Sequence, residues 1–574
     1  MLNLITESLD VWASAELPAK TGGRGRAASD SKSPHGIQKL RELILELAVR
    51  GKLLPQDPSD EPASKLLNRV AEKKAQLIKS KKLKMSKTSS RIYSDELVFD
   101  LPYSWARCPL EEYLDLNWGN TTLTKSSYSN SGVVAYSAAG PDGFIPHAEF
   151  NCEGIVISAI GARCGRCFYA NGEWTAIKNT MTLIPYSGAA EDVQLRFILI
   201  VLSIPESFPR RGGAQPFLSL GDVRATQILV PPLREQKRIV AKVDELMALC
   251  DQLEQEQTDN GNAHQSLVET LLATLTQAEG DGDFAAAWQR IAEHFDTLFT
   301  TEQSIDQLKQ TILQLAVMGK LVPQDPNDEP ASELLKKIAA EKSRLIKEKK
   351  IKKQEPLPEI SDDEKPFALP QGWEWARFDY LSLHSEAGWS PSCESIPRQG
   401  DNWGVLKVSA VTWGKYNPQE NKALPANLES KPEFEVMPGD FLISRANTAE
   451  LVARAVVVPN GAPSHLMMSD KIIRFVFAAE LNREFLTLVN GSDYSREYYA
   501  RVAGGTSSSM KNVSREQIRN LVVALPPLTE QHRIVAKVDE LMALCDALKV
   551  RLNETQLTQV RLADAIVEQA TVAV

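Results

Sequence analysis

Two runs of apolar residues, spaced in alternating steps of four and three, lie far apart in this 574-residue chain. The apolar positions are Ile239, Val243, Leu246, Cys250 and Leu253 in the first run, and Ile534, Val538, Leu541, Cys545 and Leu548 in the second. This spacing keeps the apolar side chains on one face of an α-helix and predicts a packing seam. Each run follows a Pro-Pro-Leu step that ends a β-rich stretch and begins a helix. We therefore predict two long helices whose seams pack into a core.

Both runs belong to stretches that recur. Residues 231–253 return as residues 526–548, 295 positions later, with 20 of 23 residues identical. Residues 40–79 return as residues 308–347, 268 positions later, with 25 of 40 identical. The two offsets differ by 27 residues, so the sequence between the repeats is free to change in length. We interpret the chain as a duplicated frame that carries two different inserts.

The repeat that begins at Leu40 predicts two helices joined by a turn. The first helix stops at Gly51, as its copy stops at Gly319, and Pro-Gln-Asp-Pro turns follow at 55–58 and 323–326. The second helix begins near Ser64 or Ser332 and runs into lysine-rich ends at 79–87 and 347–353. These lysines suit a solvated helix end near the negative pole of the helix dipole. The alternative is phosphate contact, which would give DNA affinity independent of sequence.

The inserts are rich in Gly, Ser and Thr and contain short apolar runs. The runs predicted as strands are 154–159, 180–184, 405–408 and 440–444. Arginines and amides lie on the Gly-containing loops between them, and loops on a rigid scaffold are where recognition usually occurs. We expect the inserts to be mostly β bodies that recognise a ligand, held by the helices.

Composition and charge narrow the class. With 43% hydrophobic and 24% charged residues the chain resembles an ordinary soluble protein, and its length suggests three or four bodies. No apolar run approaches the roughly 18 residues of a membrane helix, so we expect a cytoplasmic protein without a membrane partner. Seven scattered cysteines suit a reducing compartment. The net charge of −9 argues against a general nucleic-acid-binding surface but allows a local basic face.

Other chemical patterns are weak. The pair Cys164 and Cys167 is a single CxxC without a second pair, so packing thiols are favoured over a metal or redox site. Carboxylates such as Asp142 with Glu149, or Glu433 with Glu435, are scattered on surface-like segments, and general acid-base chemistry is not expected there. We expect no catalytic residue and no metal site.

The repeated motifs resemble those of the DNA-specificity subunit of type I restriction-modification systems. They are Pro-Pro-Leu-x-Glu-Gln-x-Arg-Ile-Val at 231–240 and 526–535, the Gly-Asp strand at 438–445, and Gly-Gly-Ala-Gln-Pro-Phe-Leu-Ser at 212–219. The second insert departs from the last motif with Gly-Gly-Thr-Ser-Ser-Ser-Met-Lys at 504–511. The resemblance covers roughly residues 36–572, and residues 1–34 match nothing identifiable.

The resemblance implies an α+β fold with two globular, mostly β target recognition domains separated by two long antiparallel helical spacers in a pseudo-two-fold repeat. The implied regions are an N-terminal extension (1–35), an N-terminal helical region (36–99), the first recognition domain (100–230), a central helical spacer (231–367), the second recognition domain (368–525) and a C-terminal helical region (526–574).

The resemblance also implies partners. Such subunits bind double-stranded DNA and two methyltransferase subunits that modify adenine at N6, and two ATP-driven restriction subunits can join them. S-adenosylmethionine, ATP and Mg²⁺ would belong to those partners. The sequence agrees, since it contains neither a Gly-x-x-x-x-Gly-Lys-Ser/Thr phosphate loop nor an Asn/Asp-Pro-Pro-Tyr/Phe methylation motif.

The repeats suggest how the helices pair. The helix from Leu233 should pack against the helices that end at Lys353, and the helix from Leu528 against the N-terminal helices from Gly36. One remaining face could accept methyltransferase helices. If the first long helix ends at Gln257, it is about 37 Å long, close to one turn of DNA at roughly 34 to 36 Å. We expect a bipartite, asymmetric target, because the inserts differ.

Candidate DNA contacts are polar residues on the insert loops. In the first insert they are Asn120, Thr122, Tyr136, Arg163, Arg166, Lys178, Asn179, Arg210, Arg211 and Gln215. In the second they are Ser390, Lys407, Arg445, Asn447, Lys471, Arg501, Ser508 and Lys511. Arginine suits guanine and amides suit adenine in the major groove, whereas Lys and Ser more often contact phosphate. The alternative for each is a surface polar residue without DNA contact.

Three function classes follow. The first is the DNA-recognition subunit just described. The second is a free-standing DNA-binding or scaffold protein built on the same frame without methyltransferase partners. The third is an enzyme in its own right, which the missing motifs disfavour.

Overall fold

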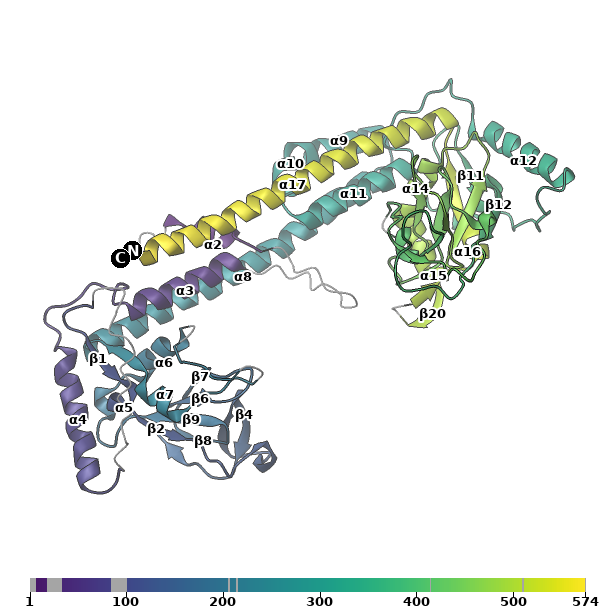
Figure 1. The fold of residues 1–574 in the computed structure, drawn as a ribbon. Helices are drawn as coiled ribbons and strands as arrows, with labels where there is room; N and C mark the ends of the chain where they lie inside the picture. The colour runs from purple at the N-terminus through teal and green to yellow at the C-terminus, as the bar shows by residue number, and fades with distance from the viewer. Residues whose placement is uncertain are drawn as a thin grey trace. The chain divides into compact units, whose positions relative to one another are not determined.

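The structure is a computed structural model, and the residues it describes are 7–17, 34–83, 101–204, 207–212, 215–412, 414–507 and 510–572. The chain divides into two compact units. The first unit comprises Met1–Gly261 and Glu554–Val574, and the second comprises Asn262–Asn553. Each unit contains a β-rich body and several helices (Figure 1), which confirms the predicted α+β class. None of the described helices is long and apolar enough to cross a membrane.

The first β-rich body contains strands β1 to β10. One sheet has the strand order β2-β9-β6-β7, a second has the order β4-β3-β8-β5, and β1 pairs with β10. The strands predicted near 154–159 and 180–184 are confirmed as β6 and β9. The bounds are β1 (Ala106–Pro109), β2 (Asp115–Trp118), β3 (Val133–Ser137), β4 (Gly140–Ile145), β5 (Phe150–Asn151), β6 (Gly154–Ser158), β7 (Cys167–Ala170), β8 (Glu173–Ala176), β9 (Thr180–Ile184) and β10 (Gln227–Val230).

Helices of the first unit surround this body and form its share of the helical frame. The apolar helix α6 packs on β6 and β7, with Phe197 and Ile198 fully buried. The bounds are α2 (Leu9–Ser14), α3 (His35–Val49), α4 (Ala63–Lys79), α5 (Leu110–Tyr113), η1 (Lys125–Ser127), η2 (Ala190–Asp192), α6 (Leu195–Ser203) and α7 (Leu220–Ala225).

The second β-rich body contains strands β11 to β22. Its sheets have the orders β12-β19-β15-β17, β14-β13-β18 and β16-β21-β20, and β11 pairs with β22. The strands predicted near 405–408 and 440–444 are confirmed as β13 and β15. The bounds are β11 (Glu374–Arg377), β12 (Ser382–Ala387), β13 (Gly404–Leu406), β14 (Asn421–Ala423), β15 (Phe441–Ser444), β16 (Ala446–Asn447), β17 (Ala455–Val457), β18 (Leu466–Met467), β19 (Ile472–Phe477), β20 (Gly504–Ser507), β21 (Met510–Asn512) and β22 (Val522–Leu525).

Helices of the second unit repeat the first pattern with additions. Helices α11 and α12 correspond to α3 and α4 in the repeat, and α9 and α10 precede them. The bounds are α9 (Asp281–Glu293), α10 (Phe295–Leu298), α11 (Glu302–Val317), α12 (Ala331–Lys347), η3 (Asp362–Glu364), α13 (Phe378–Leu381), η4 (Val408–Ala410), η5 (Pro432–Phe434), α14 (Arg483–Gly491), α15 (Asp493–Val502) and α16 (Arg515–Arg519).

Two long helices, α8 (Leu233–Gln277) and α17 (Leu528–Val572), each contain 45 residues. The predicted end of α8 at Gln257 is therefore wrong, and so is the 37 Å length that rested on it. The polar stretch near Gly261 resembles a helix stop, but Val268, Leu272 and Leu275 beyond it are buried in the second unit's core. Tertiary packing of this apolar face sustains the helix where local preference would end it.

The predicted seams are core packing. Ile239, Val243, Leu246 and Cys250 of α8 share the first unit's core with the apolar face of α3. Arg41 of α3 donates to Asp251 and Glu254 of α8, both at 2.7 Å. Because Gln56, which follows α3, contacts Glu235 at the start of α8, the two helices run antiparallel. The seam partner of α8 is thus α3, which differs from the predicted pairing.

The predicted pairings hold instead for the far ends of the long helices. Near the end of α8, Glu269 accepts a hydrogen bond of 2.9 Å from Gln307 of α11. Near the end of α17, Asp564 lies 3.0 Å from His35 of α3. The seam of α17 packs against α11, where Lys549 pairs with Asp306 at 2.6 Å. Each long helix therefore contributes its first part to one unit and its last part to the other.

The two repeated motifs meet at one joint in each unit. In the first, the carboxylate of Glu235 accepts from Gln56 at 2.6 Å and from the indole of Trp105 at 3.1 Å. Gly51 has a φ of 70°, and a Cβ there would approach the ring of Trp105 to 2.9 Å. The helix stop, the Pro-Gln-Asp-Pro turn and the start of α8 are thereby fixed to the base of the β-rich body. Arg238 closes the joint with an ion pair of 2.7 Å to buried Asp60.

The second unit repeats this joint. Glu530 accepts from Gln324 at 3.2 Å and from Trp373 at 3.0 Å. Arg533 pairs with Asp328 at 2.7 Å, matching the closing ion pair of the first joint. The joint explains why the two motifs have the same residues in both units. Each polar atom in the buried cluster needs its hydrogen-bond partner, so a change in one motif would leave an atom of the other without a partner.

Part of the N-terminal extension packs on the frame. The indole of Trp12 in α2 is fully buried, and the amide of Gly36 donates to the Ala15 carbonyl at 2.8 Å. A Cβ on Gly36 would lie 2.2 Å from the Trp12 carbonyl oxygen, so glycine permits this close approach. Gln257 of α8 also donates to the Ala13 carbonyl at 2.9 Å. Residues 7–17 thus cover the antiparallel pair formed by α3 and α8.

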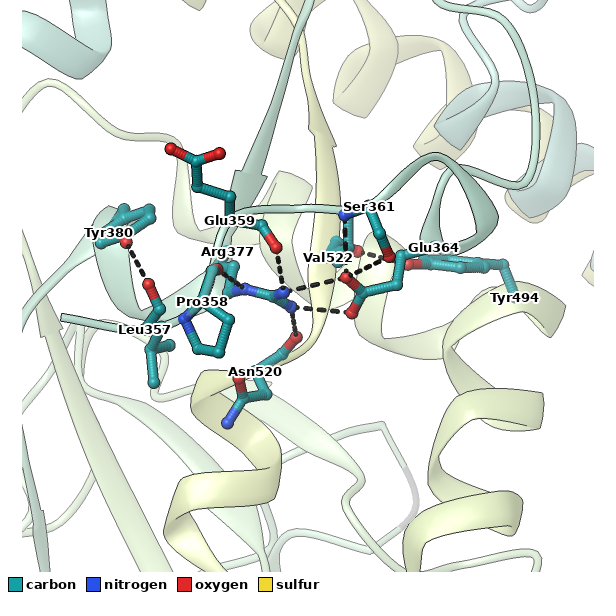
Figure 2. Close-up of polar contacts among 10 residues, drawn as sticks. All are labelled: Leu357, Pro358, Glu359, Ser361, Glu364, Arg377, Tyr380, Tyr494, Asn520 and Val522. Atoms are coloured by element: carbon teal, nitrogen blue, oxygen red, sulfur yellow. Dashed lines mark hydrogen bonds and ion pairs between the residues drawn. The ribbon is translucent and has the colours of Figure 1, made fainter.

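A loop rich in acidic residues, 357–364, is anchored to the second β-rich body by Arg377 (Figure 2). The guanidinium, only 4% exposed, donates to the carbonyls of Pro358, Glu359 and Asn520 at 2.8 to 3.1 Å. It also binds both carboxylate oxygens of Glu364, at 3.0 and 2.9 Å. The hydrogen bonds from Arg377 lower the pKa of Glu364 to about 2.

Candidate nucleic-acid interface

Loops that carry the predicted residues converge on the first β-rich body. The loop after β6 and the loop between β8 and β9 are joined where the Ala159 amide donates to the Asn179 carbonyl at 3.0 Å. The amide of Lys178 donates to the Leu123 carbonyl at 3.0 Å and draws in the segment that follows β2. Arg163 donates to the Ala139 carbonyl at 2.8 Å. Four loops separated in the sequence thus share one face.

A fifth loop, between α6 and α7, joins them. Arg211 and Phe217 exchange two backbone hydrogen bonds of 2.9 Å, and the Gly161 amide donates to the Pro216 carbonyl at 2.9 Å. A Cβ built on Gly165 would lie 3.5 Å from Nε of Arg210. Arg210, Arg211 and Gln215 therefore belong to the same face as Arg163 and Arg166, and their side chains are exposed.

A cleft of about 440 Å³ opens among these loops. Its lining residues are Thr124, Lys125, Ser137, Ala138, Ala139, Ile160, Ala162, Arg163, Ile177, Lys178 and Asn179. Asn179 has a φ of 71°, a conformation that is uncommon outside glycine and clusters at functional sites. Three cationic side chains, hydroxyls, an amide and small apolar groups match the chemistry of phosphates and base edges.

Sequence reasoning missed the polar network beside this cleft. Asp142 accepts from Lys125 and Tyr128 at 2.5 Å and from Ser137 at 2.8 Å. Although partial burial opposes it, these hydrogen bonds lower the pKa of Asp142. The network fixes Lys125 at the cleft. The sequence offers no spacing signal for it, because its members come from different strands and loops.

Two of the predicted residues of this body have other roles. Tyr136 is 8% exposed; its hydroxyl donates to the Tyr169 carbonyl at 3.0 Å, and its ring packs edge-on against Trp174. The structure places Tyr136 in the core and not on an exposed loop as predicted, because its strand β3 turns this side chain inward. Asn120 binds Glu149 with its amide nitrogen and the Thr122 hydroxyl, at 2.6 Å, with its oxygen. It shapes the loop on which exposed Thr122 lies.

A comparable group forms on the second β-rich body. Arg445 follows β15, and its amide donates to the Lys471 carbonyl at 2.8 Å. Asn447 pairs with Lys511 between β16 and β21. Asp470 binds the hydroxyl of Ser390 at 2.5 Å. These hydrogen bonds bring five predicted residues together.

The guanidinium of Arg445 differs from the other side chains of this group in its hydrogen bonding. Its Nε is buried and has no hydrogen-bond partner among the described residues. The carboxylate of Asp470 lies nearby: burial opposes ionisation, but hydrogen bonds from Ser390 and Lys471, together with the charge of Arg445, lower its pKa. A buried donor without a partner is costly, so Arg445 is a candidate for binding an acceptor.

Three other predicted residues of the second insert lie elsewhere. Arg501, on α15, lies over the ring of Tyr498, 5.8 Å from its centroid, instead of joining the group around Arg445. Lys407 pairs with Glu420 at 3.7 Å. Ser508 lies outside the described residues. Arg501 and Lys407 were predicted from loop composition to belong with the other candidate DNA contacts. The structure gives each of them a different local partner.

The lysine-rich ends are solvent-exposed. Helices α4 and α12 end at Lys79 and Lys347, as predicted, and Lys81 and Lys82 are exposed beyond the first. Residues 84–87 of the first cluster lie outside the described part of the chain. Both interpretations, solvated helix end and phosphate contact, remain compatible with this exposure.

The CxxC thiols bind separate carbonyls. Cys164 donates to the Ala159 carbonyl at 3.4 Å, and Cys167 to the Leu202 carbonyl at 3.9 Å. Burial raises the pKa of Cys167 to about 12, so it is a protonated packing group at neutral pH.

A second cleft, of about 640 Å³, lies beside the Arg377 anchor and has an acidic lining. Glu359, Glu364 and Glu516 contribute carboxylates, while Arg377 is already saturated by its carbonyl and carboxylate partners. Such a cleft repels phosphate. The basic loops, not this cleft, are the candidate DNA-binding surfaces.

Comparisons with known proteins define the class. Residues 102–260 match the family model described as "Type I restriction modification DNA specificity domain". The chain is 42% identical over 593 residues to the type I restriction enzyme EcoEI specificity subunit of Escherichia coli, with 99% of each chain covered. It is 38% identical over 610 residues to the EcoAI specificity subunit of the same organism, again with 99% of each covered.

Solved structures give weaker likenesses. The HsdS subunit from Thermoanaerobacter tengcongensis is 17% identical with a TM-score of 0.40, and the alignment covers 82% of this chain and 97% of that one. The full-length relatives are decisive: this chain belongs to the family of type I restriction enzyme specificity subunits.

Proposed function

We propose that this chain is the non-catalytic DNA-recognition subunit of a type I restriction-modification complex and reads a bipartite, asymmetric target. Residues 100–230 would read one half-site and residues 368–525 the other. The helical regions 36–99, 231–367 and 526–574 would hold the two readers and dock the partners.

The observation that carries this proposal is the contrast between joints and loops. The joints built on Glu235 and Glu530 use the same residues in both units. The basic loops differ: the first body presents Arg163, Lys178 and Asn179 around a cleft, and the second presents Arg445 with Lys511. Two bodies that are held by the same joint but carry different basic loops are suited to bind two different half-sites.

We assign the chemistry to partners. Two methyltransferase subunits would supply S-adenosylmethionine and modify adenine, and two restriction subunits would supply ATP hydrolysis with Mg²⁺. In this proposal the seam faces of α8 and α17 are used within the chain, so partner helices would dock on their remaining faces. The complex would act in the cytoplasm.

Methylome sequencing of cells with and without the chain tests the proposal. Loss of one bipartite N6-methyladenine motif on deletion, and its return on complementation, is the expected result. An unchanged methylome would contradict the proposal. The lost motif would also give both half-sites and the length between them.

The alternative is a free-standing DNA-binding scaffold. Co-purification of tagged full-length chain distinguishes the two. A methyltransferase partner near a 2:1 ratio to this chain supports the proposal, whereas a chain that purifies alone and still binds DNA favours the alternative.

A further inference from the structure

We propose that Phe217 contacts the 5-methyl group of a thymine in the major groove. The inference rests on the proposed function and adds an apolar contact to a surface that the sequence marked only by its polar residues.

Phe217 is an exposed aromatic residue within the basic face of the first β-rich body. Its side chain is 41% exposed, and it pairs through its backbone with Arg211, while Arg210 precedes that residue in the same loop. On the other side it pairs with Ile160, whose loop carries Arg163. The guanidinium of Arg211 is paired with Asp222 at 2.6 Å, so Arg210 and Arg163 are the cationic neighbours that favour nucleic acid over a second protein as the ligand of this surface.

The backbone holds Phe217 firmly. Arg211 and Phe217 exchange two hydrogen bonds of 2.9 Å, and hydrogen bonds of 2.9 Å join Gly161 to Pro216 and Leu218 to Ala159. Single exposed apolar residues are common on surfaces. An exposed ring held between two β-bridges is a different case, because the backbone of Phe217 itself is already fixed and need not be ordered when a ligand binds.

Gly212 lies beside the ring. Its φ is 83°, and a Cβ built there would lie 2.7 Å from the Gln215 carbonyl oxygen and 3.3 Å from Cδ1 of Phe217, so glycine is required mainly by the backbone. One side of the ring thus rests on backbone without a side chain, and the remaining surface is offered to a ligand.

The extent of exposure selects the kind of contact. A wedge that enters a base step must present nearly a whole ring. Phe217 is only 41% exposed, so the available surface suits a contact at a base edge. Among the base edges, the thymine methyl is the apolar group that the major groove displays, and Phe is one of the side chains that contact it.

Replacement of single thymines by uracil, which lacks the methyl group, tests this contact. Fluorescence anisotropy would use the full-length chain with its methyltransferase subunits and duplexes carrying the methylome-derived target. At one thymine, the wild-type complex should lose about fourfold in affinity, the effect expected for one buried methyl group. The Phe217→Ala complex should bind the parent duplex more weakly and show no further loss with uracil there.

Two variants complete the experiment. Phe217→Leu keeps an apolar side chain and should retain part of the uracil sensitivity. Tyr103→Ala removes another exposed aromatic, beside the joint residue Trp105, and should leave the sensitivity unchanged. If Phe217→Ala keeps wild-type sensitivity at every thymine, or binds with wild-type affinity, the inference is overturned. A wild-type complex that ignores its target duplex would instead overturn the proposed function.

Discussion

At the residue scale, the hydrogen-bond partners of a charged side chain indicate whether it holds the fold together or is available to bind a ligand. Arg377 and Arg445 lie in the same β-rich body, the first at the end of β11 and the second directly after β15. The first is saturated by carbonyls and a carboxylate, whereas the second has a buried Nε without a partner among the described residues. We therefore expect the second, and not the first, to gain hydrogen bonds on binding.

Arg445→Ala should therefore relax recognition of one half-site. We expect a loss of about 1 to 3 kcal/mol in discrimination there, the value of a good bidentate contact to a base. Binding to duplexes with substitutions in either half-site, or methylome sequencing of the variant strain, measures it. Arg501→Ala is a matched control away from this group. Equal losses at both half-sites would contradict the prediction.

The Arg377–Glu364 pair gives a pH-dependent stability. The folded-state pKa of Glu364, about 2, lies below its ordinary 4.5, so the carboxylate's contribution is complete above pH 4.5. It is lost as the pH falls through 2. Glu364→Gln should lower stability at pH 7 by roughly 1 kcal/mol, a value reduced for solvent screening of this partly exposed group. The difference from wild type should shrink below pH 4.5.

Hydrogen exchange of the 357–364 amides and urea unfolding at pH 7 and pH 3 would measure this effect. Glu359→Gln removes a charge from the same loop but keeps the carbonyl that binds Arg377. It should leave the loop protected. An equal effect of both variants would indicate general charge repulsion instead of the ion pair.

At the element scale, the joint links a helix stop, a turn and the first turn of a 45-residue helix. Glu235 lies at its centre; burial raises its pKa, and hydrogen bonds from Gln56 and Trp105 oppose that effect. The arrangement recurs at Glu530. A buried carboxylate with two donors fixes the angle between helix and β-rich body more firmly than apolar packing alone, because hydrogen bonds are directional.

Glu235→Ala should destabilise the first unit by about 1 to 3 kcal/mol, because two buried donors lose their acceptor. Glu235→Gln keeps one acceptor oxygen and should cost less. Thermal unfolding followed by circular dichroism would compare the two variants with their counterparts at Glu530. A glutamine variant as unstable as the alanine variant would show that the charge, not the hydrogen bonds, holds the joint.

At the scale of the whole molecule, the duplication separates what is repeated from what is free to diverge. The helices and joints keep their residues, and the main sheets of the two β-rich bodies have the same topology, β2-β9-β6-β7 in the first and β12-β19-β15-β17 in the second, while their loops differ. Divergence is tolerated there because loop residues carry few core contacts.

Exchange of residues 107–229 for the equivalent segment of a relative should change only the first half-site. The ends of this segment lie in β1 and β10, whose pairing joins the body to the frame. The methylome of the chimaera would show the result. A change in both half-sites would indicate that the two bodies do not read independently.

The amino-acid sequence by itself determined the periodic and repeated features of this protein. Heptad spacing indicated the seams, glycines at 51 and 319 marked the helix stops, and motif identity indicated the duplication and the family. These features are local or linear, so a single chain displays them. Several of the candidate DNA contacts also lie on loops that share one face, because glycine-rich segments between strands are typical of exposed loops.

Only the tertiary structure decided which residues meet. It extended α8 to Gln277, paired its seam with α3, joined the two repeated motifs at Glu235 and moved Tyr136 into the core. It also brought Phe217 to the basic face. Each outcome depends on contacts between residues tens to hundreds of positions apart, and burial at such contacts outweighs the local preferences that a sequence pattern records.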